Sequence, residues 1–384
     1  MDGTGLTANL FLAALLVLLL GNAAYCALSV WAAVGYRRVK PPKPALTPPI
    51  SILTPLSGTE DGLAANLASS FSQDYPNFEI LLAATEEHDA AVAVARKVMA
   101  EHPAAAARLI FTGESPYANR KVYSLERMQA EARYDLLVMN DSDIRIPRNM
   151  LRVAAAEFQD DGVGLATCPY RAVPAPSLWS VTEALGLNTH FLAGVLTARK
   201  LEGMKFALGP SIVARRSVIE EIGGWSRLKD YLAEDFVLGN LAHKAGHCVL
   251  LSSCRVLHFI GGAGFRSTMA HRIRWARSTR RSRPKGYYGE VFTSPLLPVA
   301  VCLLWRPDLW PIAALTALLR GVSAWYTASR VLEDPLFRRR WWLLPLEELV
   351  KTVVWIIGFA GNHVVWRGHK YYLHRDGQFH QAGH

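Results

Sequence analysis

The chain has 384 residues, of which 51% are hydrophobic and only 19% are charged, and its mean hydropathy is +0.13. Soluble domains carry roughly 25% charged residues, so this composition indicates apolar spans beside a polar domain and excludes a disordered, collagen-like or coiled-coil chain. The formal net charge is +10, which favours a location near anionic lipid or a phosphorylated substrate. At about 150 residues per domain, the length predicts two or three units.

The five cysteines are scattered along the chain, and no two of them form a CxxC pair. This spacing supports neither a disulfide framework nor a zinc knuckle. We therefore expect the main domain to lie on the reducing side of a membrane.

Residues 1–36 are predicted to form a transmembrane helix, because no acidic or basic side chain occurs between Asp2 and Arg37. A bilayer core needs about 20 mostly apolar residues in a helix, and the run from Leu10 to Val34 is long enough. A cleaved signal peptide fits less well, because the basic residues follow the apolar run instead of preceding it. Residues 37–49 form a basic, proline-rich linker, and the positive-inside rule places the chain after it in the cytoplasm.

Residues 50–265 alternate between strand and helix signals. Short apolar runs predict strands at Ser51–Leu56, Phe78–Thr85, Leu109–Thr112, Leu136–Met139 and Val163–Cys168. Longer segments with helical spacing are Leu63–Phe71, Ala90–Ala100, Lys121–Ala132 and Met150–Phe158. This alternation predicts an α/β domain with a mostly parallel sheet covered on both faces. Ligands of such sheets bind outside the carboxyl ends of the strands, where the acidic clusters of this chain fall.

The C-terminal third is predicted to meet the membrane again. Residues 266–290 form a basic interfacial helix, and residues 291–366 contain membrane segments at Val291–Trp305, Leu309–Trp325 and Trp341–Trp366. Two prolines in the first of these allow a re-entrant or interfacial course. Both Arg338–Arg340 and the basic tail, residues 367–384, are expected in the cytoplasm, which a single straight span between them does not allow.

Asn140-Asp141-Ser142-Asp143 directly follows an apolar strand. Two carboxylates at positions i and i+2 of a loop can hold Mg²⁺ or Mn²⁺ and leave coordination positions open for phosphate oxygens. A polar turn before a helix at Pro147 is the alternative, and these residues alone leave the two interpretations open.

Ala233-Glu234-Asp235-Phe236 opens a helical segment at Val237–Ala245. An acid at the start of a helix can simply complement the helix dipole. In an enzyme that joins a hydroxyl to a sugar, a carboxylate must accept the proton as the bond forms. Asp235 is therefore the candidate general base.

The basic segment Arg266–Lys285 contains eight Lys or Arg residues and no acid, and it includes His271-Arg272-Ile273-Arg274-Trp275. Guanidinium groups can donate paired hydrogen bonds to a diphosphate leaving group. A nucleic-acid patch is less favoured, because stacking aromatics other than Trp275 are sparse. We therefore expect no nucleic-acid partner.

In this order and spacing, the DxD, ED and near-(Q/R)xxRW motifs resemble those of membrane-bound family 2/21 glycosyltransferases with the GT-A fold. More narrowly, the chain resembles the ceramide glucosyltransferases and their bacterial relatives that glycosylate hopanoids, from about Ile52 to Lys285. Further shared motifs are Pro55-Leu56-Ser57-Gly58, Gln73-Asp74-Tyr75-Pro76, Asn119-Arg120-Lys121, Gly203-Met204-Lys205-Phe206 and Trp366-Arg367-Gly368.

The resemblance implies a GT-A catalytic domain, Rossmann-like, with flanking transmembrane or interfacial helices, a UDP-sugar donor and a divalent cation, Mg²⁺ or Mn²⁺. Asp141 and Asp143 would hold the metal. The catalytic residues would be Asp235, Arg274 and Trp275. The nucleotide would be bound by Pro55, Glu60, Glu86, Asp89, Lys121, Asp141 and Arg272. The acceptor region would contain His190, Glu234 and His271.

Three of these assignments keep an alternative. Asp89 matches the family by the Ala-Ala-Val that follows it, whereas Glu86 is better placed at the tip of its strand. His190 can equally be a satisfied helix histidine. His271 stands where the family has Gln or Arg. Because it is a histidine, its charge at this position would depend on pH.

The sequence thus predicts an inverting glycosyltransferase that moves a hexose from a UDP-sugar to the hydroxyl of a membrane lipid, with glucose and ceramide as the namesake pair. Transfer of N-acetylglucosamine to a hopanoid and a processive polysaccharide synthase are the alternatives. A membrane scaffold or nucleic-acid binder would leave both acidic motifs unexplained. We expect an integral protein of a bacterial inner membrane with a cytoplasmic catalytic domain, and the sequence sets no expectation for its oligomeric state.

Overall fold

The computed structural model describes residues 3–43, 46–262, 264–366 and 369–381. The chain divides into two compact units. The sheet unit consists of Val39–Pro176, Glu202–Gly262 and Asn362–His384, and the helical unit consists of Met1–Arg38, Ser177–Leu201 and Ala263–Gly361. Two segments therefore depart from the predicted boundaries. Ser177–Leu201 was expected in the catalytic domain but belongs to the helical unit, and Asn362–His384 belongs to the sheet unit.

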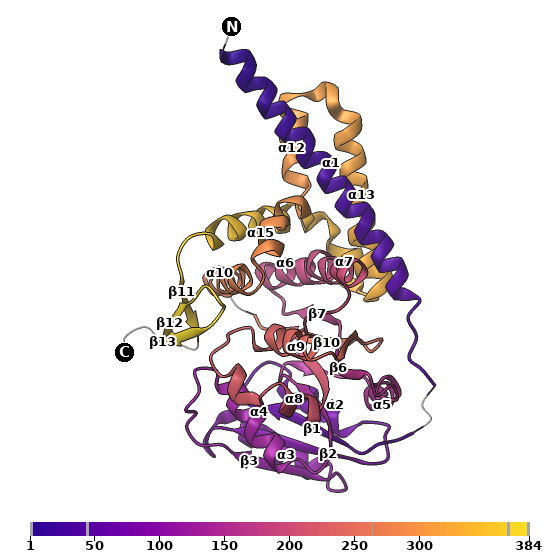
Figure 1. Cartoon of the computed structure of the whole chain (residues 1–384), viewed down its shortest axis with the longest axis vertical. Coiled ribbons are helices and arrows are strands. Elements are labelled where there is room, and N and C mark those ends of the chain that lie inside the picture. Colours follow the sequence, from indigo (N-terminus) through magenta and orange to yellow (C-terminus); the bar gives the residue numbers. More distant parts are fainter. Residues whose placement is uncertain (1–2, 44–45, 263, 367–368, 382–384) are drawn as a thin grey trace. The chain divides into compact units, whose positions relative to one another are not determined.

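A seven-stranded sheet in the order β3-β2-β1-β4-β8-β6-β9 forms the centre of the sheet unit (Figure 1). Its strands are β1 (Ile50–Pro55), β2 (Phe78–Ala84), β3 (Ala107–Phe111), β4 (Leu136–Asn140), β6 (Val163–Thr167), β8 (Ser211–Arg215) and β9 (Cys248–Leu251). All neighbours pair in parallel except β8, which is antiparallel to both β4 and β6. The predicted α/β class with a mostly parallel sheet is confirmed.

The parallel strands are continuous apolar runs because helices cover the sheet. The helices of the sheet unit are α2 (Leu63–Phe71), α3 (Ala90–Glu101), α4 (Arg120–Glu131), α5 (Met150–Glu157), α8 (Arg216–Glu221), η2 (Trp225–Leu228) and α9 (Glu234–Lys244). β1 and β4 are almost wholly buried. The carboxyl ends of β1 and β4 lie next to each other in the sheet, and this edge carries the residues discussed below.

Two small sheets complete the sheet unit. β5 (Ile144–Arg145), β10 (Val256–Ile260) and β7 (Tyr170–Pro174) form one of them. β11 (His363–Trp366), β12 (His369–Leu373) and β13 (Phe379–Gln381) form the other, an antiparallel C-terminal sheet. Arg367, Gly368 and residues 382–384, part of the predicted basic tail, lie outside the described residues.

The helical unit begins with α1 (Gly3–Arg37), which runs beside α12 (Leu296–Trp305) and α13 (Trp310–Trp325) (Figure 1). Leu15 and Leu19 of α1 pack against side chains of α12 and α13. Other faces of α1 expose large apolar side chains such as Leu10, Val17 and Leu20. Among the described residues, Leu6–Arg37 is the helix that is long and apolar enough to cross a membrane, with a mean hydropathy of 2.2.

The remaining elements of the helical unit are shorter. They are α6 (Leu178–Gly186), the π-helix η1 (Leu187–Phe191), α7 (Leu192–Glu202), α10 (Phe265–Ser282), α11 (Pro284–Gly289), η3 (Glu290–Thr293), η4 (Pro307–Leu309), the π-helix η5 (Tyr326–Val331), α14 (Pro335–Arg340), η6 (Trp341–Leu343) and α15 (Leu344–Gly358). The predicted segment Val291–Trp305 is bent. Pro284–Thr293 and Leu296–Trp305 meet at 44°, and they qualify as a membrane span only as a pair.

The predicted membrane segment Trp341–Trp366 is wrong as a single span. Its helix α15 ends at Gly358, and His363–Trp366 is a strand. At about 1.5 Å per residue, the 15 residues of α15 reach roughly 22 Å, less than a bilayer core of about 30 Å. Three charged side chains of α15, those of Glu347, Glu348 and Lys351, are also buried within the protein. In the part of the chain that the structure describes, no single straight helix joins Arg338–Arg340 to the C-terminal strands.

Candidate active site

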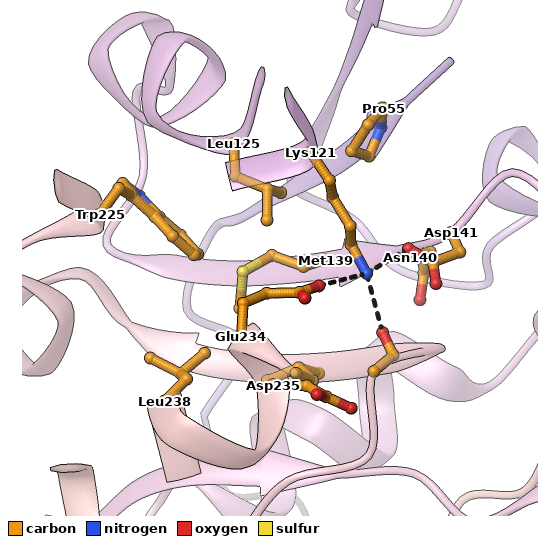
Figure 2. Close-up of a pocket in the computed structure, with 12 residues that line it drawn as sticks. Pro55, Lys121, Leu125, Met139, Asn140, Asp141, Trp225, Glu234, Asp235 and Leu238 are labelled. Atoms are coloured by element: carbon orange, nitrogen blue, oxygen red, sulfur yellow. Dashed lines mark hydrogen bonds and ion pairs between the residues drawn. The ribbon is translucent and has the colours of Figure 1, made fainter. Parts of the chain in front are cut away.

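A pocket of the sheet unit lies at the carboxyl ends of β1 and β4 (Figure 2). Its polar side chains come from the end of β4 and the loop after it, from α4 and from the start of α9. The full lining comprises Pro55, Lys121, Leu125, Met139, Asn140, Asp141, Gly209, Ile212, Trp225, Glu234, Asp235 and Leu238. Five residues predicted for the site from the sequence, in four different segments, are thereby brought together: Pro55, Lys121, Asp141, Glu234 and Asp235.

Lys121 stands at the centre of this pocket because of the way α4 begins. Asn119 caps the helix, and its side-chain oxygen accepts hydrogen bonds from the backbone N–H groups of Lys121 and Val122. The amide nitrogen of the same side chain donates to the Tyr231 carbonyl at 2.9 Å and to Glu234 Oε2 at 3.1 Å. One side chain therefore fixes both the start of α4 and the approach to α9.

The Lys121 ammonium is surrounded by oxygen atoms. Its Nζ lies 2.6 Å from Asp141 Oδ1 and 3.2 Å from Glu234 Oε1, and it donates to the Gly209 carbonyl at 3.4 Å. Burial by itself lowers the pKa of Lys121, but the charges of Asp141 and Glu234 outweigh burial, so the pKa lies above its usual value. Lys121 is thus a permanent cation beside the carboxylates of Asp141 and Glu234.

The loop after β4 presents two carboxylates. Asp141 is held by backbone bonds to Pro210 and Ile144. Burial, reinforced by Asp143 and Glu234 and opposed by Lys121, raises the pKa of Asp141 to about 6. Asp143 Oδ2 lies 3.1 Å from His258 Nε2.

The donor set of this loop fits a hard divalent cation. Asp143 Oδ1 is buried and has no hydrogen-bond partner among the described residues, so it remains available as a ligand. Within the same part of the chain, no three His, Cys, Asp or Glu side chains are grouped to hold a metal by themselves. A cation on Asp141 and Asp143 would therefore complete its coordination with water or with a ligand's phosphate oxygens, as Mg²⁺ commonly does.

Asp235 lies in the first turn of α9, beside Glu234. A Cβ added at Gly209 would approach Asp235 Oδ2 to 2.8 Å, so the absence of a side chain at Gly209 makes room for the carboxylate. Burial and the neighbouring Glu234 raise the pKa of Asp235 to about 7, although Lys121 and the N–H of Phe236 act in the opposite direction. A carboxylate with this pKa can accept a proton near neutral pH.

Pro55 lines the pocket. Glu60, Glu86 and Asp89, which were also predicted to bind the nucleotide, are not among its lining residues. Asp89 caps α3 and also accepts a hydrogen bond from the Gly58 N–H at 2.9 Å. It therefore fastens the loop after β1 to the loop after β2. Glu60 and Glu86 are exposed on these two loops. Their predicted contact with a nucleotide stays a prediction.

Five further predicted residues belong to the helical unit. His190 lies in the π-helix η1, and its Nδ1 is 3.0 Å from the Lys351 ammonium. His271 Nδ1 lies 2.9 Å from Glu183 Oε1, and Arg272 Nη2 donates to Glu347 Oε1 at 3.0 Å. Arg274 and Trp275 lie on the same helix, α10.

The sequence assigned no role in the site to Asn119, Gly209 or His258, although Asn119 belongs to a motif shared with the family. Asn119 carries a local signal, since Asn is a preferred N-cap directly before the predicted helix. Gly209 and His258 carry none, because each meets its partner only in the folded chain: Gly209 lies 26 positions before Asp235, and His258 lies 115 positions after Asp143.

The chain matches the model of glycosyl transferase family 21 over residues 12–379. It is 30% identical to ceramide glucosyltransferase 1 of Caenorhabditis elegans over 197 residues, 51% of this chain and 42% of that protein. It is 25% identical to ceramide glucosyltransferase 3 of the same organism over 231 residues, 60% of this chain and 50% of that protein. The chain thus spans about half the length, or less, of these relatives.

The fold also resembles a solved structure, a mannosyltransferase from Pyrobaculum calidifontis in complex with GDP-Man and Mn²⁺. The similarity covers 90% of this chain and 98% of that one, with a TM-score of 0.52 and 18% sequence identity. This likeness shows the fold, which is of the GT-A type, and the predicted fold class is confirmed.

Proposed function

Because the chain belongs to glycosyl transferase family 21, we propose that it transfers a hexose from a UDP-sugar to the hydroxyl group of a membrane lipid, with inversion at the anomeric carbon. Glucose and ceramide are the donor sugar and acceptor that its relatives' names suggest. The apolar helix α1 and these relatives together indicate membrane association.

The observation that carries the proposal is the position of Asp235. Its carboxylate lies in the pocket, and its pKa is raised to about 7. In the proposed reaction, the acceptor oxygen attacks the anomeric carbon and the bond from that carbon to the diphosphate breaks. The hydroxyl proton passes to Asp235, and the electron pair of the broken bond leaves with UDP. A carboxylate with a pKa near the working pH is well suited to accept this proton.

Lys121 and the DxD loop are assigned to the donor's diphosphate. The Lys121 ammonium already pairs with two acids, and phosphate oxygens could replace one of them. Asp141 and Asp143 would hold a divalent cation, which supplies further positive charge to the leaving group. Electrostatic stabilisation of this kind is usually the largest contribution to catalysis.

The helical unit is assigned to the lipid and to the leaving group. The family resemblance supports Arg272, Arg274 and Trp275 as leaving-group residues, and His190 and His271 as acceptor residues. In His190, Nδ1 faces the Lys351 ammonium and so acts as an acceptor, which leaves Nε2–H as the donor of the neutral ring. We propose that this N–H donates a hydrogen bond to the hydroxyl oxygen of the lipid that receives the sugar.

We propose that the sheet unit lies on the cytoplasmic side of a bacterial inner membrane, because Arg37 ends α1 and Arg38, Lys40 and Lys43 follow it. Cys248 of the sheet unit is exposed, and the other four cysteines are buried. A membrane-impermeant maleimide should therefore label inverted inner-membrane vesicles but not intact spheroplasts. Cys248→Ser is the control, and labelling in intact spheroplasts would reverse the orientation.

The deciding experiment is to incubate membranes containing the protein with UDP-glucose, UDP-N-acetylglucosamine or GDP-mannose, each with ceramide or a hopanoid. Mass analysis of the lipid product names donor and acceptor together. Asp235→Asn should abolish transfer while donor binding persists. Transfer by this variant at the wild-type rate would remove Asp235 from the role of base, and a product with many added sugars would favour the processive synthase.

A further inference from the structure

Five consecutive side chains of the helical unit, Arg338 to Trp342, are exposed to solvent. We call them the arginine–tryptophan patch. Trp341 and Trp342 expose 60% and 55% of their surface, although indole rings are usually buried. Three adjacent cations and two adjacent exposed indoles form a surface that the proposed glycosyl transfer does not use.

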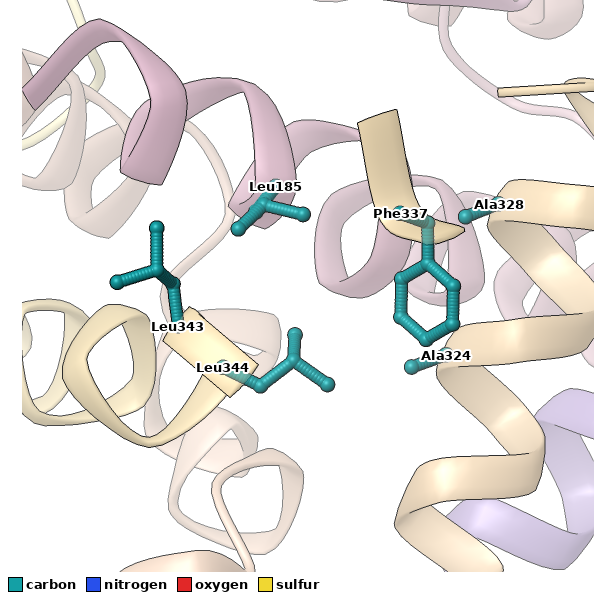
Figure 3. Close-up of a cluster of buried hydrophobic side chains, with 6 residues drawn as sticks. All are labelled: Leu185, Ala324, Ala328, Phe337, Leu343 and Leu344. Atoms are coloured by element: carbon teal, nitrogen blue, oxygen red, sulfur yellow. The ribbon is translucent and has the colours of Figure 1, made fainter. Parts of the chain in front are cut away.

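Buried side chains hold the patch at both ends (Figure 3). Phe337 precedes it, and Leu343 and Leu344 follow it, and all three belong to one core cluster with Leu185 of α6 and two alanines of the α13–η5 segment. At the start of α14, Asp334 accepts a hydrogen bond from the Leu336 N–H and another from Asn188 Nδ2. The patch is therefore presented by a fixed turn, and its exposure does not come from a loose end.

The helix geometry explains how three adjacent arginines can face outward together. Successive helical residues are about 100° apart, so Phe337 points into the core while Arg338, Arg339 and Arg340 spread over the remaining circumference. Long arginine side chains can bend toward one surface while their stems cover apolar neighbours. The three guanidinium groups can thus reach a common plane beside the indoles.

The charges of the patch are not neutralised by the protein. Among the described residues, none of the three guanidinium groups forms an ion pair or a hydrogen bond with another side chain, whereas Arg306 of the same unit is paired with Asp308. Arginine binds phosphate groups in a bidentate manner, and exposed tryptophan favours the interface between water and lipid. The complementary partner is an anionic surface that also has apolar depth.

We propose that the arginine–tryptophan patch binds the headgroups of anionic phospholipids and anchors the helical unit at the membrane surface. The three arginines contact the lipid phosphates, and Trp341 and Trp342 enter the interface. This inference goes beyond the proposed glycosyl transfer and holds or fails independently of it, because its test measures lipid binding and not product.

The test uses the full chain, purified in a nonionic detergent and titrated with dioleoylphosphatidylglycerol or dioleoylphosphatidylcholine, with bound lipid counted by native mass spectrometry. Each arginine near an anionic surface strengthens binding about fivefold. We therefore expect phosphatidylglycerol to bind at least tenfold more tightly than phosphatidylcholine. Arg338→Gln/Arg339→Gln/Arg340→Gln should remove this preference, and the triple Lys variant at the same positions should keep most of it.

A matched control separates the patch from net charge. Lys97, Arg127 and Lys244 are exposed on helices of the sheet unit, and their triple Gln variant loses the same charge but should keep the lipid preference. An equal loss in this control, or an undiminished preference in the patch variant, would overturn the proposal. If the triple Gln variant melts well below the wild type, the three single Gln variants should each lose part of the preference.

Two further arms distinguish the source of the phosphate and the role of the indoles. Millimolar inorganic phosphate should leave phosphatidylglycerol binding unchanged, and complete displacement would make the patch a site for free anions instead. Trp341→Ala/Trp342→Ala should weaken the binding of both lipids several-fold while the preference for phosphatidylglycerol remains. Unchanged binding of both lipids would exclude the indoles from the contact.

Discussion

At the scale of single residues, Lys121 is the cation around which the pocket is organised. Its ammonium contacts oxygen atoms of Asp141, of Glu234 and of the Gly209 carbonyl. Removing the charge would leave the acids of the pocket without their nearest cation, and their pKa values would rise further because like charges would face each other.

We predict that Lys121→Met lowers kcat/KM for the donor about a hundredfold, the usual loss when one preorganised charge is removed from a leaving group. Lys121→Arg keeps the charge and should retain part of the activity. Steady-state kinetics with varied donor concentration check this. A Met variant with wild-type kcat/KM would exclude Lys121 from the diphosphate site.

The pH dependence follows from Asp235, whose pKa is raised to about 7. Only the carboxylate form accepts a proton, so kcat/KM should rise with pH up to about 7 and then level off. In Lys121→Met the rise should move to higher pH, because Lys121 lowers the pKa of Asp235. A pH profile of initial rates checks both statements, and a profile that is flat from pH 5 to pH 8 would contradict them.

Gly209 is predicted to be sensitive to a single methyl group. An added Cβ would lie 2.8 Å from Asp235 Oδ2, so Gly209→Ala should displace the carboxylate and lower kcat by up to about a hundredfold, as small misplacements of catalytic groups do. Gly261→Ala is the matched control, because nothing lies within 4 Å of its added Cβ. Equal activity of the two variants would show that the carboxylate position tolerates the shift.

At the scale of elements, the sequence predicts the strands and helices of the sheet unit well. The predicted helix Leu63–Phe71 has the observed bounds, and the predicted strand Val163–Cys168 differs from β6 by one residue. Continuous apolar runs between polar turns leave little choice of element there. The DxD loop and the ED pair were found for the same reason, since each directly adjoins a clear element.

The sequence could not assign elements whose partners are distant in the chain. α6 has an ordinary amphipathic pattern, and only its packing against Leu344 and Ala324 shows that it belongs to the helical unit. The strands β11 to β13 are short and rich in His and Tyr, and they follow the apolar helix α15 after a short turn at Gly361. Their membership of the sheet unit depends on contacts with residues 118 and 230–232.

The start of α4 carries a testable prediction about Asn119. Asn119→Asp keeps an oxygen that accepts from the first turn but loses the amide that donates to Tyr231 and Glu234. We expect this variant to keep the wild-type melting temperature within a few degrees. It should lose activity about tenfold or more, because the new carboxylate would face that of Glu234.

Asn119→Ala is the comparison variant, and it should lose both the cap, worth about 1 kcal/mol of stability, and the activity. Thermal melting and transfer rates measured on the same preparations separate the two roles. Full activity of Asn119→Asp would show that the bond to Glu234 is dispensable.

At the scale of the whole molecule, the C-terminal sheet supports the segment that leads into the pocket. Phe379 is buried in a cluster with Tyr371 and Leu373, against which Ala118 and Leu232 pack. The Phe379 N–H donates to the Asp230 carbonyl at 2.7 Å, and Tyr231 next to it accepts from Asn119. A continuous set of contacts thus joins β13 to the start of α4 within the sheet unit.

We predict that Phe379→Ala lowers the free energy of unfolding of the sheet unit by about 3–5 kcal/mol, the usual cost of emptying a buried aromatic site. The variant should also lose activity, because Asp230 and Tyr231 would lose the contacts with β13 that hold them in place. Val365→Ala, at a position that is 65% exposed in the same small sheet, should change stability by less than about 0.5 kcal/mol. Denaturant unfolding and transfer assays check both variants, and a fully active Phe379→Ala would separate the C-terminal sheet from the pocket.

The place of the C-terminal sheet in the chain also sets an order of assembly. Phe379 follows Glu234 by 145 positions, and the helical segment Ala263–Gly361 lies between them. During synthesis, every pocket residue is therefore made before the strand that supports the pocket wall. The ribosome must first synthesise the helices of Ala263–Gly361, so the pocket wall gains its support only after those helices have been made. A chain cut within them would contain all the residues of its pocket and still lack a finished one.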